Sequence, residues 1–221
     1  MQKIKEIIKD NRVFFLLYCI FFFISGIYIT FFPREHFLIF LNSLNNPFLD
    51  SFFKYMTFLG DGIFILIVLL PISFLRVRFA ILTVITYAVS GIITQIIKHI
   101  VQSPRPLNYL IDLEILHKVS GIDIYYYNSF PSGHSATGFA FFLLLSLITK
   151  NKRISFIFFL FAFFIGLSRI YLLQHFLVDV WAGSFIGIIV TIITFYIFET
   201  NEKINNSNLL NFSLYYKLKQ I

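Results

Sequence analysis

Long apolar runs alternate with short polar segments along the whole chain. Six runs are free or nearly free of charged residues, and they lie at residues 13–32, 62–75, 79–97, 135–149, 154–168 and 180–198. None shows the alternation of apolar and polar positions that marks the strands of a membrane barrel. A helix satisfies its own backbone hydrogen bonds in lipid, and a full span needs roughly 20 apolar residues. We therefore predict an all-α fold, a bundle of six transmembrane helices.

Several predicted spans extend into the flanks of these runs. We place the spans near residues 13–32, 59–76, 79–97, 132–149, 154–169 and 177–198. The fourth and fifth runs have only about 15 residues each, or ~22 Å of helix, so polar residues at their ends are expected at or below the membrane surface. Nothing resembles an internal repeat or a second domain. Residues 1–221 are predicted to form a single membrane-embedded domain.

Two connections are longer than the tight turns expected between antiparallel helices. The first, residues 33–61, has apolar stretches broken by Asn45-Asn46-Pro47, which predicts helices lying in the membrane interface. The second, residues 101–131, carries Tyr125-Tyr126-Tyr127, which is typical of an interfacial aromatic belt. Both connections fall on the same predicted side of the membrane, the outer one.

Composition and charge agree with an integral membrane protein. Hydrophobic residues make up 58% of the chain, and the mean hydropathy is +0.81. Of the 18 Lys and Arg residues, twelve fall on the side of the two termini and six on the other. The positive-inside rule then predicts cytoplasmic termini, and the same excess explains the net charge of +7 without a nucleic-acid partner. Size and layout suit a bacterial inner membrane.

Three blocks of polar residues interrupt the apolar pattern at the outer ends of the predicted spans. They are Lys98 with Arg105-Pro106, then Ser132-Gly133-His134, then Arg169 with His175 and Asp179. Ionisable groups at or near membrane depth are functional-site candidates by default. The predicted topology brings all three blocks to one face, so we expect them to form one site.

The third block has the spacing of a nucleophile and its partner. His175 and Asp179 are four residues apart, which on a helix places both side chains on one face. A carboxylate that accepts the Nδ1 proton fixes the tautomer and leaves the Nε2 lone pair free. We therefore expect His175 to be a nucleophile. His134 lies where it could protonate a leaving oxygen as a general acid.

The cations Lys98, Arg105 and Arg169 supply what a phosphoryl group requires. Arginine offers a planar fork and lysine a compact charge, and an anion between them relieves their mutual repulsion. Ser132 and Gly133 are expected at a helix start, where free N–H groups bind anions. Snorkelling to headgroups would explain any one cation, but not three beside two histidines. The same cations argue against a zinc ion, so we expect no metal or other cofactor.

The motifs together have a family resemblance. Lys98-x6-Arg105-Pro106, Pro131-Ser132-Gly133-His134 and Ser168-Arg169-x5-His175-x3-Asp179 resemble the three signature motifs of the type 2 phosphatidic acid phosphatase superfamily. The resemblance implies a metal-independent membrane phosphatase that works through a covalent phosphohistidine. By this resemblance His175 attacks phosphorus, Asp179 orients it and His134 protonates the leaving group. The residues implied to hold the phosphoryl oxygens are Lys98, Arg105, Ser132, Gly133 and Arg169.

The sequence therefore predicts an integral-membrane lipid phosphatase whose site faces the extracytoplasmic side. The partners implied are the bilayer and a membrane lipid carrying a phosphate monoester or diphosphate. Candidate substrates are undecaprenyl diphosphate, a lipid A phosphate, phosphatidylglycerol phosphate and phosphatidic acid. A lipid-to-lipid phosphotransferase stays open as an alternative because the same covalent chemistry permits it. A non-catalytic anion or lipid transporter is a further alternative, but it would need the cations and not the His175–Asp179 pair.

Overall fold

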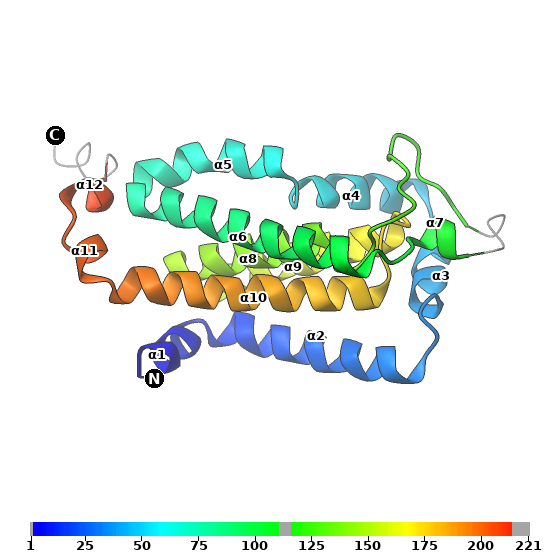
Figure 1. Ribbon diagram of the computed structural model, residues 1–221, viewed down its shortest axis with the longest axis horizontal. Coiled ribbons are helices and arrows are strands. Elements are labelled where there is room, and N and C mark those ends of the chain that lie inside the picture. Colours follow the sequence, from blue (N-terminus) through cyan, green and yellow to red (C-terminus); the bar gives the residue numbers. More distant parts are fainter. Residues whose placement is uncertain (1, 111–115, 214–221) are drawn as a thin grey trace.

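A computed structural model describes residues 2–110 and 116–213, which form helices and no strand (Figure 1). The helices are α1 (Gln2–Asp10), α2 (Arg12–Phe31), α3 (His36–Ser43), α4 (Pro47–Phe58), α5 (Gly62–Leu75), α6 (Val77–Val101), α7 (Pro106–Tyr109), α8 (Gly133–Thr149), α9 (Lys152–Tyr171), α10 (Leu177–Thr200), α11 (Glu202–Asn205) and α12 (Asn208–Asn211). The predicted all-α fold is confirmed for this part of the chain.

Four helical segments of the described chain are long and apolar enough to cross a membrane. They contain α2, α6, α9 and α10. The pair α4 and α5 passes the same test jointly, but it bends by 60° at its break, and α8 is shorter, with 17 residues. The chain therefore has four clear candidate spans, or five when the bent pair is one span. The count of six stays a prediction that includes α8.

Two predicted helix boundaries need correction. The fifth span was expected to be short and to end near residue 169, but α9 has 20 residues and continues to Tyr171. The third span was expected to end before Lys98, which instead lies in the last turn of α6. A hydropathy pattern stops at the first charged residue, whereas a helix continues where the protein interior accommodates that charge. The expected shortness of the fourth helix is confirmed by α8.

The first long connection contains the helices expected of it. Asn46 caps α4 by accepting a hydrogen bond from the Leu49 N–H, and Pro47 occupies the first helical turn. Phe53 of α4 is buried, and its ring lies 4.6 Å from that of Tyr171 at the end of α9. The second connection contains only α7 among its described residues, since residues 111–115 lie outside the described part.

The helix α8 forms the centre of the bundle, and α10 packs closely against it. Twelve of the 17 residues of α8 are buried. A Cβ atom added to Gly183 of α10 would lie 2.4 Å from the Ser132 carbonyl oxygen, and one added to Gly187 would lie 2.2 Å from that of Ala136. Small residues at this spacing let the two backbones approach. This contact fixes α8 relative to α10.

The two ends of the bundle differ in what they carry. Figure 1 shows α1 and α12 at one end, and α3 and α7 at the other. The turn from α9 to α10 belongs to the end with α3 and α7, since Asn42 of α3 donates a hydrogen bond to the carbonyl oxygen of Tyr171. The start of α8 lies there too, because the Ser132 N–H donates a hydrogen bond to the carbonyl oxygen of Asp179 in α10. The three polar blocks of the sequence therefore meet at the end opposite α1 and α12.

Candidate active site

Each of the three polar blocks occupies the end of a helix. Lys98 lies in the last turn of α6, Arg105 directly precedes α7, and Ser132 caps α8. Gly133 and His134 open α8, Arg169 lies in the last turn of α9, His175 lies in the turn that follows, and Asp179 lies in the first turn of α10. His134 interacts electrostatically with Arg169, His175, Arg105 and Lys98. The structure thus brings the predicted residues to one place.

His175 and Asp179 form a buried pair. The Nδ1 atom of His175 lies 3.5 Å from Oδ2 of Asp179, and the two residues are 2% and 0% exposed. The expectation that both lie on one helix is wrong, because α10 begins at Leu177. The pair forms because Asp179 turns back toward the preceding residues, where its Oδ2 accepts the Phe176 N–H at 2.9 Å. One carboxylate therefore caps α10 and contacts the imidazole ring.

The surroundings of His175 keep its ring neutral. Burial lowers its pKa from 6.5 to about 3, with Asp179 acting in the opposite direction and the cations Arg105 and Lys98 lowering it further. A neutral imidazole whose Nδ1 faces a carboxylate carries its proton there, so the lone pair lies on Nε2. This is the protonation state that a nucleophilic histidine requires.

Ser129 is a member of the site that the sequence did not indicate. Its hydroxyl donates a hydrogen bond to Oδ2 of Asp179 at 2.5 Å and lies 3.4 Å from Nδ1 of His175. The side chain is fully buried. It therefore fixes the same carboxylate oxygen that faces the imidazole. Arg34 is a second unforeseen neighbour, with its Nη2 atom 3.4 Å from Oδ1 of Asp179.

The three cations of the site are held by neutral oxygen atoms. Lys98 donates to the Asn128 carbonyl at 2.6 Å, Arg169 to the Thr57 hydroxyl at 2.6 Å, and Arg105 to the Gln174 side chain at 3.0 Å and the Tyr127 carbonyl at 2.9 Å. In the described part of the chain, no carboxylate lies within 4.0 Å of their charged nitrogens.

These cations are also poorly solvated. Lys98 is 6% exposed and Arg169 is 8% exposed, and the Nε atom of Arg169 is buried without a hydrogen-bond partner. Buried charge is costly unless it is paired, and the positive charges of Lys98, Arg105 and Arg169 interact with one another. An anion bound among them would remove both penalties.

The start of α8 lies beside these cations, since its second residue, His134, interacts electrostatically with all three. Ser132 accepts hydrogen bonds from the Ser135 N–H at 3.3 Å and from the Ser135 hydroxyl at 2.9 Å, and the residue is fully buried. A Cβ added to Gly133 would have Thr94 Oγ1 as its nearest neighbour, at an ordinary 3.9 Å. Packing within the protein does not require glycine there. A ligand that approaches the backbone closely would require it.

The described residues offer no group of three or more His, Cys, Asp and Glu side chains placed to hold a metal ion. His134, His175 and Asp179 therefore do not form such a group. The imidazole of His134 makes no hydrogen bond within the described chain and so has its nitrogens free for a ligand. Metal independence itself stays a prediction.

Comparison with known proteins assigns the family. The sequence model of the PAP2 superfamily matches residues 79–203, more than half of the chain, and this range contains all three motif blocks. The chain belongs to the PAP2 superfamily. The family prediction made from the motifs is thereby confirmed.

Two solved structures are similar to the chain. LpxE from Aquifex aeolicus is 30% identical, with a TM-score of 0.67 over 76% of this chain and 98% of that one. A transmembrane PAP2-type phosphatidylglycerolphosphate phosphatase from Bacillus subtilis is 19% identical, with a TM-score of 0.59 over 88% and 98% of the two chains, and that likeness concerns the fold alone. No curated protein compared with the chain matches it. Membership in this superfamily supports lipid phosphatase activity.

Proposed function

We propose that this chain hydrolyses a phosphate monoester or diphosphate of a membrane lipid through a phosphohistidine on His175. One observation carries the proposal. A buried, neutral His175 contacts Asp179 beside three cations that have no carboxylate partner in the described chain. A nucleophile beside unneutralised positive charge fits attack on an anionic phosphoryl group.

In the first step, Nε2 of His175 attacks phosphorus and the bond from phosphorus to the lipid oxygen breaks. Asp179 holds the Nδ1 proton and stabilises the positive charge that develops on the ring. Lys98, Arg105 and Arg169 bind the phosphoryl oxygens together with Ser132 and the N–H groups that begin at Gly133. His134 donates a proton to the leaving oxygen of the lipid.

In the second step, water attacks the phosphohistidine. His134, which lost its proton in the first step, accepts one from this water, and the bond between phosphorus and Nε2 breaks. Inorganic phosphate leaves, and both histidines return to their starting states. The steps balance without a metal or another cofactor.

The substrate is a lipid whose phosphate lies at the membrane surface. The site lies at the end of the bundle opposite α1 and α12, and the excess of Lys and Arg at the termini favours an extracytoplasmic site in a bacterial inner membrane. Undecaprenyl diphosphate, lipid A phosphate, phosphatidylglycerol phosphate and phosphatidic acid all present a phosphate at this depth.

The test is phosphate release by the purified protein from each of these four lipids, with and without a chelator. We expect release from at least one lipid, unaffected by the chelator, and its loss in His175→Ala. The matched control is His99→Ala, because His99 is an exposed histidine of α6. Its Nδ1 atom contacts the carbonyl oxygen of Gln95 in the same helix. Activity retained in His175→Ala would contradict the proposed nucleophile.

Product analysis separates hydrolysis from the two alternatives. Transfer to a second lipid would place labelled phosphate in that lipid and not in solution. Transport would move a labelled lipid or anion across a vesicle membrane without breaking the phosphate bond, and it would persist in His175→Ala. Free inorganic phosphate as the product supports hydrolysis over both.

A further inference from the structure

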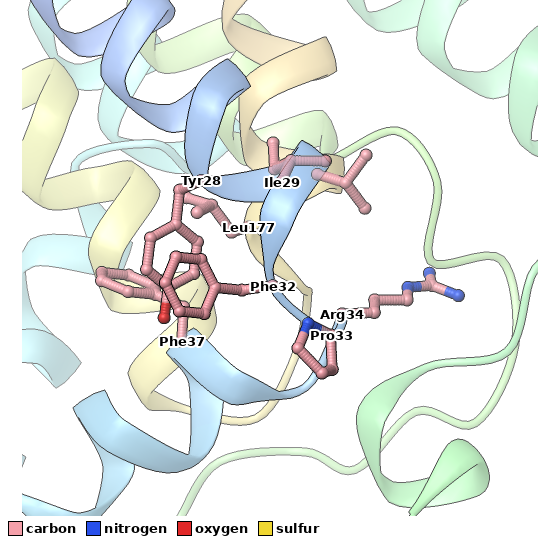
Figure 2. A pocket seen from close by; sticks show the side chains of 8 residues that line it. Tyr28, Ile29, Phe32, Pro33, Arg34, Phe37 and Leu177 are labelled. Carbon is pink, nitrogen blue, oxygen red and sulfur yellow. The ribbon is translucent and has the colours of Figure 1, made fainter.

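Arg34 lies between the first span and the candidate active site. It lies three residues after the end of α2 and borders a cavity of about 250 Å³ whose other walls include Tyr28, Phe32, Phe37 and Leu177. Figure 2 shows the guanidinium group extending away from these aromatic rings and not into their midst. The Arg34 side chain therefore points away from the apolar part of the cavity.

The guanidinium group reaches the first turn of α10. Its Nη2 atom lies 3.4 Å from Oδ1 of Asp179, and its carbon atom lies 4.0 Å from the centre of the Phe176 ring. A second aromatic ring, that of Tyr109, lies 5.6 Å away. Stacking between these rings holds the planar group in one orientation. The Arg34 side chain is 26% exposed, so the ion pair is only partly open to solvent.

The two oxygens of Asp179 have different partners. Oδ2 accepts hydrogen bonds from Ser129 and from the Phe176 N–H, and it faces Nδ1 of His175. Oδ1 has Arg34 as its hydrogen-bond partner, and no other described residue donates to it. A fully buried carboxylate needs both oxygens satisfied. Arg34 therefore holds the carboxylate from the side opposite the imidazole.

We propose that Arg34 is a positioning residue that fixes the Asp179 carboxylate so that its Oδ2 stays directed at His175. The inference rests on the proposed function for its catalytic consequence. Arg34 lies outside residues 79–203, the range that matches the family model, and outside all three motifs. The segment that follows α2 would thus contribute a positioning residue to the site in addition to the residues of the three motifs.

Arg34 also affects the charge that His175 experiences. The charged and titratable groups that face His175 are Asp179 on α10, Lys98 on α6, Arg105 before α7 and His134 on α8. The positive charge of Arg34 interacts with the negative charge of Asp179 at Oδ1, the carboxylate oxygen that does not face His175. Removal of Arg34 would leave more of that charge for the imidazole, while Ser129 and the Phe176 N–H still hold Oδ2 near the ring, so the pKa of His175 should rise. A residue that only packs between helices would not have this effect.

The kinetic test compares Arg34→Gln, Arg34→Lys and a matched control. Loss of orientation should lower kcat of Arg34→Gln by about 10-fold to 100-fold, with KM changed little, because Arg34 is not among the phosphate-binding cations. Arg34→Lys keeps the charge and should recover part of kcat. Arg76→Gln is the control, since Arg76 also lies near a phenylalanine ring but at the opposite end of the bundle. Unchanged kcat in Arg34→Gln, or an equal loss in Arg76→Gln, would overturn the proposal.

A second measurement does not depend on turnover. The imidazole titration of His175 is followed by NMR in 15N-histidine-labelled protein, with His175→Asn used to assign the signal. We expect the titration to move to higher pH in Arg34→Gln, and an unmoved titration would overturn the proposal. If the wild type released no phosphate from any lipid, the proposed function would fail while this titration still decided the role of Arg34. Arg34→Met serves as the second variant if Arg34→Gln does not fold, because it keeps apolar contact with Phe176.

Discussion

The backbone N–H of Ser132 donates a hydrogen bond to the backbone carbonyl of Asp179 at 2.9 Å. This bond joins the cap of α8 to the first turn of α10. It therefore couples the turn proposed to bind phosphate to the residue that contacts His175. The relative placement of the two motifs depends on how closely α8 and α10 approach.

Substitution of Gly183 tests whether the site depends on the close approach of α8 and α10. In Gly183→Ala the new Cβ would lie 2.4 Å from the Ser132 carbonyl, a backbone atom that can move only if α8 and α10 separate. We expect a lower Tm and a loss of activity of about 100-fold, since displacements of ~1 Å near a reacting centre have effects of this size. Gly91→Ala is the matched control, because a Cβ there meets nothing within 4 Å. Equal behaviour of the two variants would contradict the coupling.

Ser129 provides a test of the contacts around the carboxylate. Ser129→Ala removes the hydroxyl that donates to Oδ2 of Asp179. A hydrogen bond to a charged group contributes about 1.5–3 kcal/mol, so kcat should fall by about 10-fold to 100-fold with little change in KM. Ser51→Ala, which removes a serine hydroxyl that bonds within α4, is the control. A change confined to KM would place Ser129 in substrate binding instead.

Arg169 tests the proposed phosphate site. Arg169→Ala removes a buried cation, so we expect KM to rise, kcat to fall, and competitive inhibition by inorganic phosphate to weaken by about 10-fold or more. Arg153→Ala, at the exposed opposite end of the same helix, should leave all three values unchanged. Undiminished inhibition by phosphate in Arg169→Ala would remove this residue from the anion site.

The acid stability of the protein should depend on His175. With a pKa of about 3 in the folded protein and 6.5 when unfolded, the ring binds a proton on unfolding between these values. Stability therefore falls as the pH falls through this window, because the unfolded state binds more protons. Between pH 8 and pH 5 the wild type should lose about 2 kcal/mol relative to His175→Asn. Unfolding in phosphate-free detergent buffer measures this difference, and parallel pH profiles would contradict a neutral, buried His175.

Part of this architecture was predictable from the sequence. The apolar runs indicated the helical bundle, and the predicted topology of the spans brought Lys98, His134 and His175 to one site. The predicted start of a helix at Ser132 was also correct, because a serine cap before a long apolar run is a local signal.

Other features depended on contacts that no local pattern carries. Ser129 and Arg34 reach Asp179 across 50 and 145 residues of chain. No proline marks the bend between α4 and α5. Pro47 lies in the first turn of α4 and Pro71 lies inside α5, so neither is at the break. The i,i+4 argument for His175 and Asp179 gave the right pair with the wrong geometry, since a helix cap and not a helix face brings them together.

Trapping of the covalent intermediate tests the central claim most directly. The protein is mixed with a 32P-labelled lipid phosphate, denatured rapidly, and mapped by mass spectrometry. We predict an acid-labile, base-stable phosphoryl group on His175 that forms before inorganic phosphate appears and is absent from His175→Ala. Label on another residue, or full phosphate release by His175→Ala, would contradict the account.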